Sequence, residues 1–344
     1  MGSGGVLVQA THRDLVVVGA SAGGVEALRA LVAGLPEDLP AAVAVVLHVP
    51  RTGTSALARI LDRAGPLPAT TARQGEPVTP GRIVVAPPDH HLVVVDGRFA
   101  LTRGPTENGH RPAVDALFRS AAVVRGARTI GVVLSGTLDD GAAGCAAIRR
   151  RGGAVIVQDP VDALYPGMPE AVRAVVPAAV LPAAAMGPAI AALTRRSAEG
   201  RGRALPDHVL LEDAIVREGE EVGVVGTPSE FSCPDCRGVL NQVEPTRFRC
   251  QVGHAWTAAA LGDAQDEAVQ RALWTAVRSL EERTALAVRM ADAATERGDE
   301  RRVSHYRERR AEASDAARVL RTLLNPDPPG DPRAPEHPGA PPQR

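Results

Sequence analysis

Short runs of apolar, mainly β-branched residues alternate with segments of helical periodicity over the first 194 residues. The β-rich runs cover residues 15–18, 43–47, 83–86, 92–95, 129–134 and 154–157, and the helical patterns cover 25–35, 112–124, 142–150 and 183–194. This alternation predicts a mostly parallel β-sheet with helices on both faces, a three-layer α/β/α domain. Asp96-Gly97 lies between two β-rich runs and predicts a small antiparallel hairpin.

The pattern changes after about residue 195. Gly, Arg, Pro and Glu dominate up to about residue 230, and later apolar residues recur at spacings of three and four, interrupted at Gly298-Asp299. The later pattern predicts an antiparallel helical hairpin that is suited to joining an oligomer. We therefore expect a disordered leader at 1–12, an α/β domain at 13–196, a linker at 197–230, a cysteine module at 231–257, a helical hairpin at 258–325 and a disordered Pro-rich tail at 326–344.

Composition excludes several classes of protein. The net charge of −1 gives no electrostatic signature of nucleic-acid binding. No run of 18 apolar residues and no secretory leader appears, so we expect a cytoplasmic protein without membrane insertion. The sequence contains no lysine, which excludes a Walker-A lysine, a pyridoxal Schiff base and a kinase-type lysine.

The first β-rich run leads directly into the glycine-rich stretch GASAGG and then into a helical pattern. Gly19-x-Ser21-x-Gly23 fits a nucleophile elbow, in which a tight strand-to-helix turn presents a serine hydroxyl at the end of a sheet. A phosphate-binding loop and a purely structural turn are the alternatives. From this stretch alone, all three remain open.

Two further polar residues also follow β-rich runs. His48 comes directly after residues 43–47, and Asp140 lies in the loop after residues 129–134. In an open parallel sheet, functional sites gather at the carboxyl ends of strands. Ser21, His48 and Asp140 therefore form a candidate triad of nucleophile, general base and base-orienting carboxylate.

These motifs resemble the catalytic domain of the chemotaxis receptor methylesterases, the CheB family. The matching stretches are GASAGG at 19–24, HVP at 48–50, GRIVVAPPDHHL at 81–92, GPTENGHRPAVDALFRSA at 104–121, SGTLDDGAAG at 135–144 and ALYPGMPEA at 163–171. The resemblance implies hydrolysis of glutamate γ-methyl esters on chemoreceptors, often with deamidation of receptor glutamines. It places the nucleophile on Ser21, the base on His48 and the carboxylate on Asp140.

The resemblance also implies an oxyanion site formed by the backbone N–H groups of Ala22 and Thr137. The family often has threonine and methionine at these positions, and we expect the differences to tune activity because the backbone groups remain. His91 matches a family histidine with either a structural or a substrate-facing role. Asp139 is expected to be a solvated loop charge, with competition for His48 as the alternative.

Only about a dozen residues precede the first strand, so we expect no receiver domain in this chain. The fragment 1–196 is then expected to be active alone. The expected partners are a methylated chemoreceptor-like substrate and, beyond it, a receptor methyltransferase or a separate response regulator. The alternative function is a signalling adaptor that binds a receptor or partner through its C-terminal modules. Methanol release distinguishes the two.

Four metal-binding residue types cluster late in the chain. Cys233 and Cys236 form a CxxC pair, and Cys250 and His254 follow thirteen residues later as CxxxH. This spacing predicts a closed, tetrahedral and therefore structural Zn²⁺ site, with a redox CxxC as the rival. The cysteine module resembles the zinc-ribbon extension of some receiver-less methylesterases. No cofactor is expected for catalysis.

Overall fold

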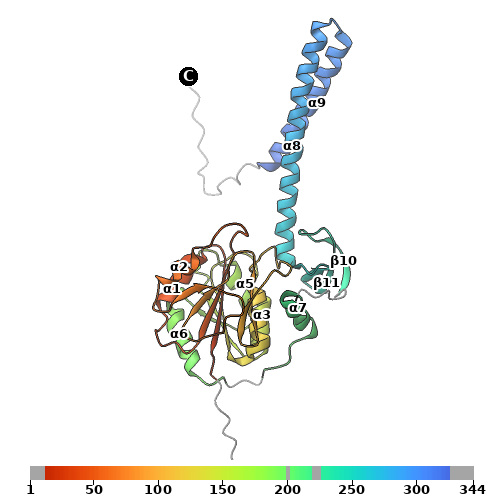
Figure 1. Cartoon of the computed structure of the whole chain (residues 1–344). Coiled ribbons are helices and arrows are strands. Elements are labelled where there is room, and N and C mark those ends of the chain that lie inside the picture. Colours follow the sequence, from red (N-terminus) through yellow and green to blue (C-terminus); the bar gives the residue numbers. More distant parts are fainter. Residues whose placement is uncertain (1–11, 199–201, 219–225, 326–344) are drawn as a thin grey trace, which may run out of the picture. The chain divides into compact units, whose positions relative to one another are not determined.

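The computed structural model describes residues 12–198, 202–218 and 226–325 (Figure 1). The chain divides into two compact units, with the boundary after Gly262. Most of the expected leader and the whole expected tail lie outside the described residues. Each unit is described by itself below.

A seven-stranded sheet forms the centre of the first unit. Its strands are β1 (Leu15–Ala20), β2 (Ala42–Leu47), β3 (Ala69–Thr71), β4 (Ile83–Val85), β7 (Thr129–Val133), β8 (Ala154–Gln158) and β9 (Ala179–Leu181). Their order is β3-β4-β2-β1-β7-β8-β9, and every pairing is parallel. β1 and β2 are buried along their whole length, as expected of strands covered on both faces.

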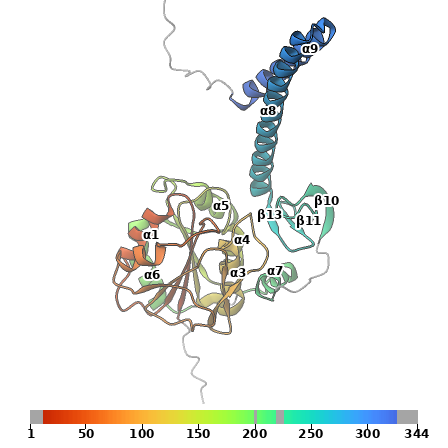
Figure 2. The same ribbon diagram turned by 45° about the horizontal axis from the view of Figure 1, so that its top comes forward.

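Helices cover both faces of this sheet (Figure 2). They are α1 (Gly24–Ala33), α2 (Leu57–Asp62), α3 (Val114–Arg125), α4 (Ala142–Arg150), α5 (Gly167–Val175) and α6 (Ala183–Arg195), with a short 3₁₀ turn at Gly126–Arg128. Apolar side chains of α1, α2 and α6 form one core with the sheet, and those of α3, α4 and α5 form the other. The predicted three-layer architecture is confirmed, and the predicted hairpin is β5 (His91–Val95) with β6 (Arg98–Thr102).

The sheet brings three strand ends to one edge. β1 lies between β2 and β7. The strands β2, β3 and β4 lie on one side of β1, and β7, β8 and β9, which come later in the chain, lie on the other side. Ala20 pairs with Leu47, and Gly19 pairs with Val133, so the three carboxyl ends are level. A crevice at such a reversal point is where open α/β sheets bind ligands.

The expected linker contains ordered structure, which corrects that prediction. Helix α7 (Asp207–Glu218) packs against α3, and the side chains of Glu212 and Asp213 are buried. Its inner face is charged, because Arg119 and Arg247 pair there with Glu212. Glu212 and Asp213 share the buried face with Ile215 and Val216, so carboxylates interrupt the apolar stripe and the hydrophobic periodicity of α7 is weak.

The cysteine module forms a four-stranded antiparallel sheet that begins earlier than expected, at Thr227. Its strands are β10 (Thr227–Ser232), β11 (Val239–Glu244), β12 (Arg247–Cys250) and β13 (Ala255–Thr257). Phe231 and Phe248 pack edge to face with ring centroids 5.4 Å apart, and Trp256 is buried. The cysteine module belongs to the same compact unit as the seven-stranded sheet, rather than standing apart from it.

The second unit contains two long helices, α8 (Ala258–Glu296), of which the part from Asp263 belongs to this unit, and α9 (Glu300–Leu324). Val277 and Ala287 of α8 and Ala313 and Ala317 of α9 are buried, which agrees with the predicted seam. None of the helices in the described part of the chain is both long and apolar enough to cross a bilayer.

Candidate active site

Ser21 begins the turn between β1 and α1. Its backbone N–H donates to the Ser135 carbonyl at 2.9 Å, which ties the turn to the loop after β7. A Cβ on Gly136 would lie 2.9 Å from the Ser21 Cβ and 2.1 Å from the Met168 sulfur. Only glycine therefore lets this loop approach the serine so closely.

His48 begins directly after β2, and its backbone N–H donates to the Ala20 carbonyl at 3.1 Å. Its imidazole connects the other two candidate residues: Nδ1 lies 3.2 Å from Ser21 Oγ, and Nε2 lies 2.7 Å from Asp140 Oδ2. The side chain is 6% exposed. A Nε2–H tautomer donates to the carboxylate and leaves Nδ1 free to accept the serine proton.

Asp140 lies at the N-terminus of α3 and accepts three hydrogen bonds. Besides His48, the backbone N–H groups of Val114 and Asp115 donate to it, at 2.7 and 2.9 Å. Burial alone would raise the pKa of Asp140, but the hydrogen bond from His48, the interaction with its ring and the two backbone N–H groups lower it to about 2. The carboxylate is therefore ionised at neutral pH, next to the positive end of a helix dipole.

The loops around Ser21 also offer unused backbone donors. Neither the Ala22 nor the Thr137 N–H donates to an acceptor in the described part of the chain. Ser135 fixes both loops, since its hydroxyl donates to the Ala22 carbonyl at 2.7 Å and accepts from the Tyr165 N–H at 2.9 Å. The sequence interpretation did not single out Ser135, because a buried serine in a loop has no distinctive pattern.

His91 is fully buried, which favours the structural role of the two that the sequence left open. Its Nδ1 accepts from the Ala113 N–H at 3.2 Å, and its Nε2 donates to the Pro105 carbonyl at 3.0 Å. Burial lowers the pKa of His91, which agrees with a neutral ring. With both nitrogens engaged by backbone, the ring has no free atom for a substrate.

His110 lies on the triad instead. Its ring stacks on that of His48, with centroids 3.7 Å apart and planes at 11°. Burial and then the neighbouring His48 lower the pKa of His110 to about 4, so this ring is neutral at pH 7. The adjacent Arg111 braces the loop through Asp89 and the carbonyls of Arg103 and Gly104.

Asp139 departs from the expected solvated loop charge. Its Oδ1 accepts a hydrogen bond from the Thr257 hydroxyl at 2.8 Å, and no contact with His48 is found among the described residues. Burial raises the pKa of Asp139, and the Thr257 bond opposes this. The carboxylate is thus bonded to the cysteine module rather than competing for the base.

The four predicted metal ligands lie together. One ligand atom from each of Cys233, Cys236, Cys250 and His254 can be chosen so that all lie within 4.8 Å of one another. The Cys236 and Cys250 sulfurs are 3.6 Å apart, and His254 Nδ1 lies 3.8 and 3.4 Å from the Cys233 and Cys250 sulfurs. Tetrahedral Zn²⁺ with bonds of about 2.0–2.3 Å has ligand separations of roughly 3.5–3.8 Å, so these three separations are compatible with this ion.

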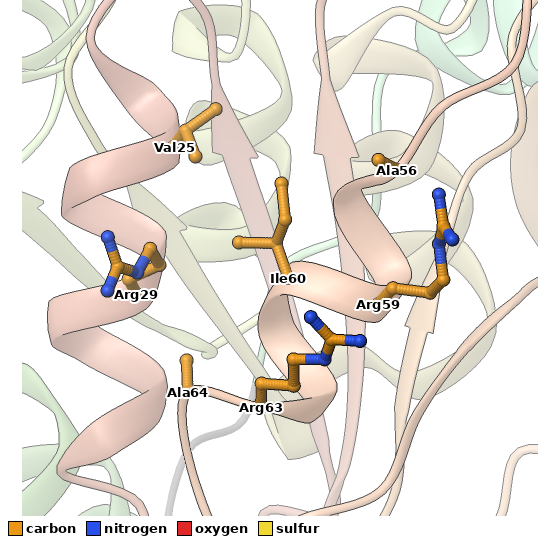
Figure 3. A pocket seen from close by; sticks show the side chains of 7 residues that line it. All are labelled: Val25, Arg29, Ala56, Arg59, Ile60, Arg63 and Ala64. Carbon is orange, nitrogen blue, oxygen red and sulfur yellow. The ribbon is translucent and has the colours of Figure 1, made fainter.

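Two adjoining grooves lie on the side of the sheet that α1 and α2 cover, and the first of them begins next to His48. One, of about 340 Å³, is lined by Val49 and Pro50 directly after His48, and the other, of about 470 Å³, lies between α1 and α2. Figure 3 shows the second groove, with Arg29 on α1, Arg59 on α2 and Arg63 directly after α2. Within the part of the chain that the structure describes, none of these three exposed guanidinium groups pairs with a carboxylate.

The fold and the site together define an α/β protein in which Ser21, His48 and Asp140 are hydrogen-bonded in a row at the reversal point of a parallel sheet. The sequence profile described as CheB methylesterase matches residues 16–190, just over half of the 344 residues. The chain therefore belongs to the CheB methylesterase family.

Similar proteins agree with this assignment. A protein-glutamate methylesterase/protein-glutamine glutaminase of Symbiobacterium thermophilum is 44% identical over 161 residues, covering 46% of this chain and 44% of that relative. A protein of the same description from Nocardioides sp. is 42% identical over 200 residues, covering 57% and 53%. The crystal structure of the Thermotoga maritima CheB methylesterase catalytic domain matches 53% of this chain and 100% of that chain, with a TM-score of 0.50 and 34% identity. The chain spans about half the length of the curated relatives it matches.

Proposed function

We propose that this protein is a serine esterase that hydrolyses glutamate γ-methyl esters on a methylated chemoreceptor-like protein. The observation that carries the proposal is the hydrogen-bonded chain from Ser21 through His48 to Asp140 at the level strand ends. Membership of the CheB methylesterase family supplies the substrate class. The relatives' description as protein-glutamate methylesterases supports the same class.

In the proposed reaction, Ser21 Oγ attacks the ester carbonyl while His48 Nδ1 takes its proton. Asp140 accepts from His48 Nε2–H throughout and stabilises the imidazolium that forms. The ring presents Nδ1 to the serine and Nε2 to the carboxylate, the reverse of the chymotrypsin arrangement. The backbone N–H groups of Ala22 and Thr137 bind the oxyanion of the tetrahedral intermediate.

The intermediate then collapses by breaking the bond to the methoxy oxygen, and His48 returns the proton so that methanol leaves. Water next attacks the acyl-enzyme, with His48 again as base, and releases the glutamate carboxylate and Ser21. A primary amide enters the same cycle with ammonia as the leaving group. The glutaminase part of the relatives' description supports this second activity.

The cysteine module is proposed to hold one structural Zn²⁺ through Cys233, Cys236, Cys250 and His254. Four protein ligands close the coordination sphere, so the ion would supply folding energy rather than catalysis. Elemental analysis of the purified protein should find about one zinc per chain. A zinc-free protein with unchanged protease resistance across residues 227–257 would refute this assignment.

Methanol release from methylated receptor membranes tests the esterase proposal. Wild-type protein should release methanol, and Ser21→Ala should lower kcat by at least about 10⁴-fold because no other nucleophile replaces the hydroxyl. Circular dichroism should show the same fold for both proteins. Methanol release by Ser21→Ala at the wild-type rate would refute the triad, and receptor binding without turnover by the wild type would favour the adaptor alternative.

A further inference from the structure

The 104–111 loop forms one wall of the candidate active site. It leaves β6, passes behind His91 and ends with His110 stacked over His48. A planar, uncharged ring on the face of the base restricts its rotation and excludes water from that face. Whatever holds this loop therefore holds the position of His48 against Ser21.

The outer side of the loop is bonded to β13 of the cysteine module. The Asn108 N–H donates to the Ala255 carbonyl at 2.8 Å, and the Ala255 N–H donates to the Thr106 carbonyl at 3.1 Å. The Thr257 N–H donates to Asn108 Oδ1 at 2.8 Å. On this side the loop is thus bonded to a three-residue strand, and a side chain at Gly109 would begin 3.3 Å from the ring of Trp256.

Two further side-chain contacts connect the cysteine module to loops beside the candidate triad. The Thr106 hydroxyl donates to Asp235, which lies inside the Cys233–Cys236 knuckle. The Thr257 hydroxyl donates to Asp139, next to Asp140, and accepts from the Ala260 N–H at 3.2 Å. Loops on two sides of the candidate triad, at Thr106 and at Asp139, therefore contact the cysteine module.

β13 is itself short and depends on the turn that precedes it. It pairs with β12, and the turn between them runs from Cys250 to His254, two of the four ligands. The Cys250 N–H donates to the His254 carbonyl at 3.0 Å. A metal ion at these ligands would fix both ends of this turn, and the strand that follows supports the 104–111 loop.

A buried group of charges joins the same elements. Glu107 of the loop pairs with Arg119 of α3 at 2.5 Å and with Arg249 of β12 at 3.7 Å. Glu212 of α7 pairs with Arg249 at 3.5 Å and with Arg247 at 3.0 Å. Charges buried this deeply are costly unless they stay paired, so loop, α7 and cysteine module should hold or release together.

We propose that the cysteine module is a metal-dependent brace of the active site: Zn²⁺ at its four ligands holds β13, β13 holds the 104–111 loop, and the loop positions His110 over His48. In this scheme His110, Thr106 and Thr257 are positioning residues and do not touch the substrate. The inference rests on the esterase function proposed above for the turnover measurements, and on the contacts alone for the position of the loop.

The first experiment removes the metal from the full-length protein with a chelator and restores it with Zn²⁺ alone. Hydrogen exchange of residues 104–111 is measured with and without metal, beside kcat and KM for methanol release. We expect exchange at least about tenfold faster in the metal-free protein. We also expect kcat to fall by up to about 100-fold with KM within about twofold, and Zn²⁺ to reverse both.

The second experiment removes single hydrogen bonds between the cysteine module and the α/β domain while the metal stays bound. Thr106→Val and Thr257→Val each remove one hydroxyl from the brace at nearly constant volume, and Ser229→Ala is the matched control because its hydroxyl bonds only within the cysteine module. Each valine variant should keep its zinc and lower kcat by about tenfold. Thr257→Ser should restore kcat, and Ser229→Ala should match the wild type.

Substitution of His110 tests whether its side chain acts by stacking on His48 or as an acid–base group. His110→Phe keeps a planar face and should retain most of the wild-type kcat, whereas His110→Ala should lose about tenfold. An unchanged pH profile in His110→Phe would agree with positioning through the ring face.

The outcomes separate the two proposals. If metal-free protein keeps kcat within about twofold and the loop keeps its protection, the brace is wrong while the esterase stands. If the wild type releases no methanol, the esterase is wrong, and exchange in residues 104–111 alone decides the brace: unchanged protection without metal overturns it, and lost protection supports it.

Discussion

The parallel sheet and the cysteine module differ in what stabilises them, although both contribute to one site. The sheet buries β1 and β2 completely between two apolar cores. The cysteine module has four short strands, a small aromatic cluster and a buried group of charges. Apolar burial is therefore the main contribution to the stability of the sheet, whereas we expect the stability of the cysteine module to depend on its proposed metal ligands and its ion pairs.

This difference leads us to expect that the reaction depends first on residues at the edge of the sheet. The largest loss of kcat should therefore follow a substitution there. Asp140→Asn should lower kcat by about 10⁴-fold, because an amide offers one oxygen where the carboxylate accepts from His48, Val114 and Asp115. Zinc content and the thermal unfolding of the cysteine module should stay unchanged.

Asp139→Asn is the matched control for that substitution. The amide oxygen can still accept from the Thr257 hydroxyl, so the loss should stay below about tenfold. Equal losses in the two variants would show that the base is not oriented by Asp140 alone.

Two truncations test whether turnover requires the cysteine module. The fragment 1–262 should keep kcat within about twofold, and the fragment 1–198 should lose about 10- to 100-fold because the 104–111 loop loses β13 and Asp235. Steady-state kinetics on one methylated receptor preparation measure both. This revises the sequence expectation that residues 1–196 are active alone, and full activity of the shorter fragment would restore it.

Acid should release the cysteine module before it unfolds the sheet. Burial would raise the pKa of Glu212, but Arg247, Arg249 and Arg119 lower it from 4.5 to about 2. The stability that this carboxylate contributes is therefore complete above about pH 4.5 and is lost as the pH falls towards 2. Fluorescence of Trp256 in a Trp274→Phe background follows this release.

Glu212→Gln is the control for the acid transition. The variant should be less stable at neutral pH, and its remaining stability should depend less on pH between 4.5 and 2. An acid transition identical to that of the parent protein would assign the release to another group.

The smallest expected effect concerns the arginines between α1 and α2. If an acidic receptor segment lies in this groove, Arg29→Gln, Arg59→Gln and Arg63→Gln should each raise KM by roughly 1.5- to 5-fold at low salt, with kcat unchanged. The effect should fade as salt screens the charges. Equal KM values at low and high salt would exclude this groove from substrate binding.

The sequence predicted the sheet and the meeting of Ser21, His48 and Asp140 at its edge because both depend on local pattern. Apolar runs mark buried strands, and polar residues at their ends mark the site, as with Ser21 and His48. Helix α7 was missed because Glu212 is stabilised by arginines 93, 35 and 37 residues away. No local pattern contains such partners.

The histidines show the same limit. His91 and His110 both stand in motif-like stretches, but one ring is buried between backbone groups and the other stacks on His48. Which ring reaches the triad depends on the path of the 104–111 loop. Part of that path is held by Ala255 and Thr257, nearly 150 residues further along the chain.

The bond between the side chains of Thr106 and Asp235 has a consequence for how related sequences diverge. One partner belongs to the α/β domain and the other to the cysteine module, and neither has a local reason to be retained. In relatives that carry both segments, substitutions at these two positions should occur together, and relatives without the cysteine module should vary freely at 106–108. In an alignment that separates the two kinds of relative, the two positions should therefore show correlated substitutions only in the relatives that carry both segments.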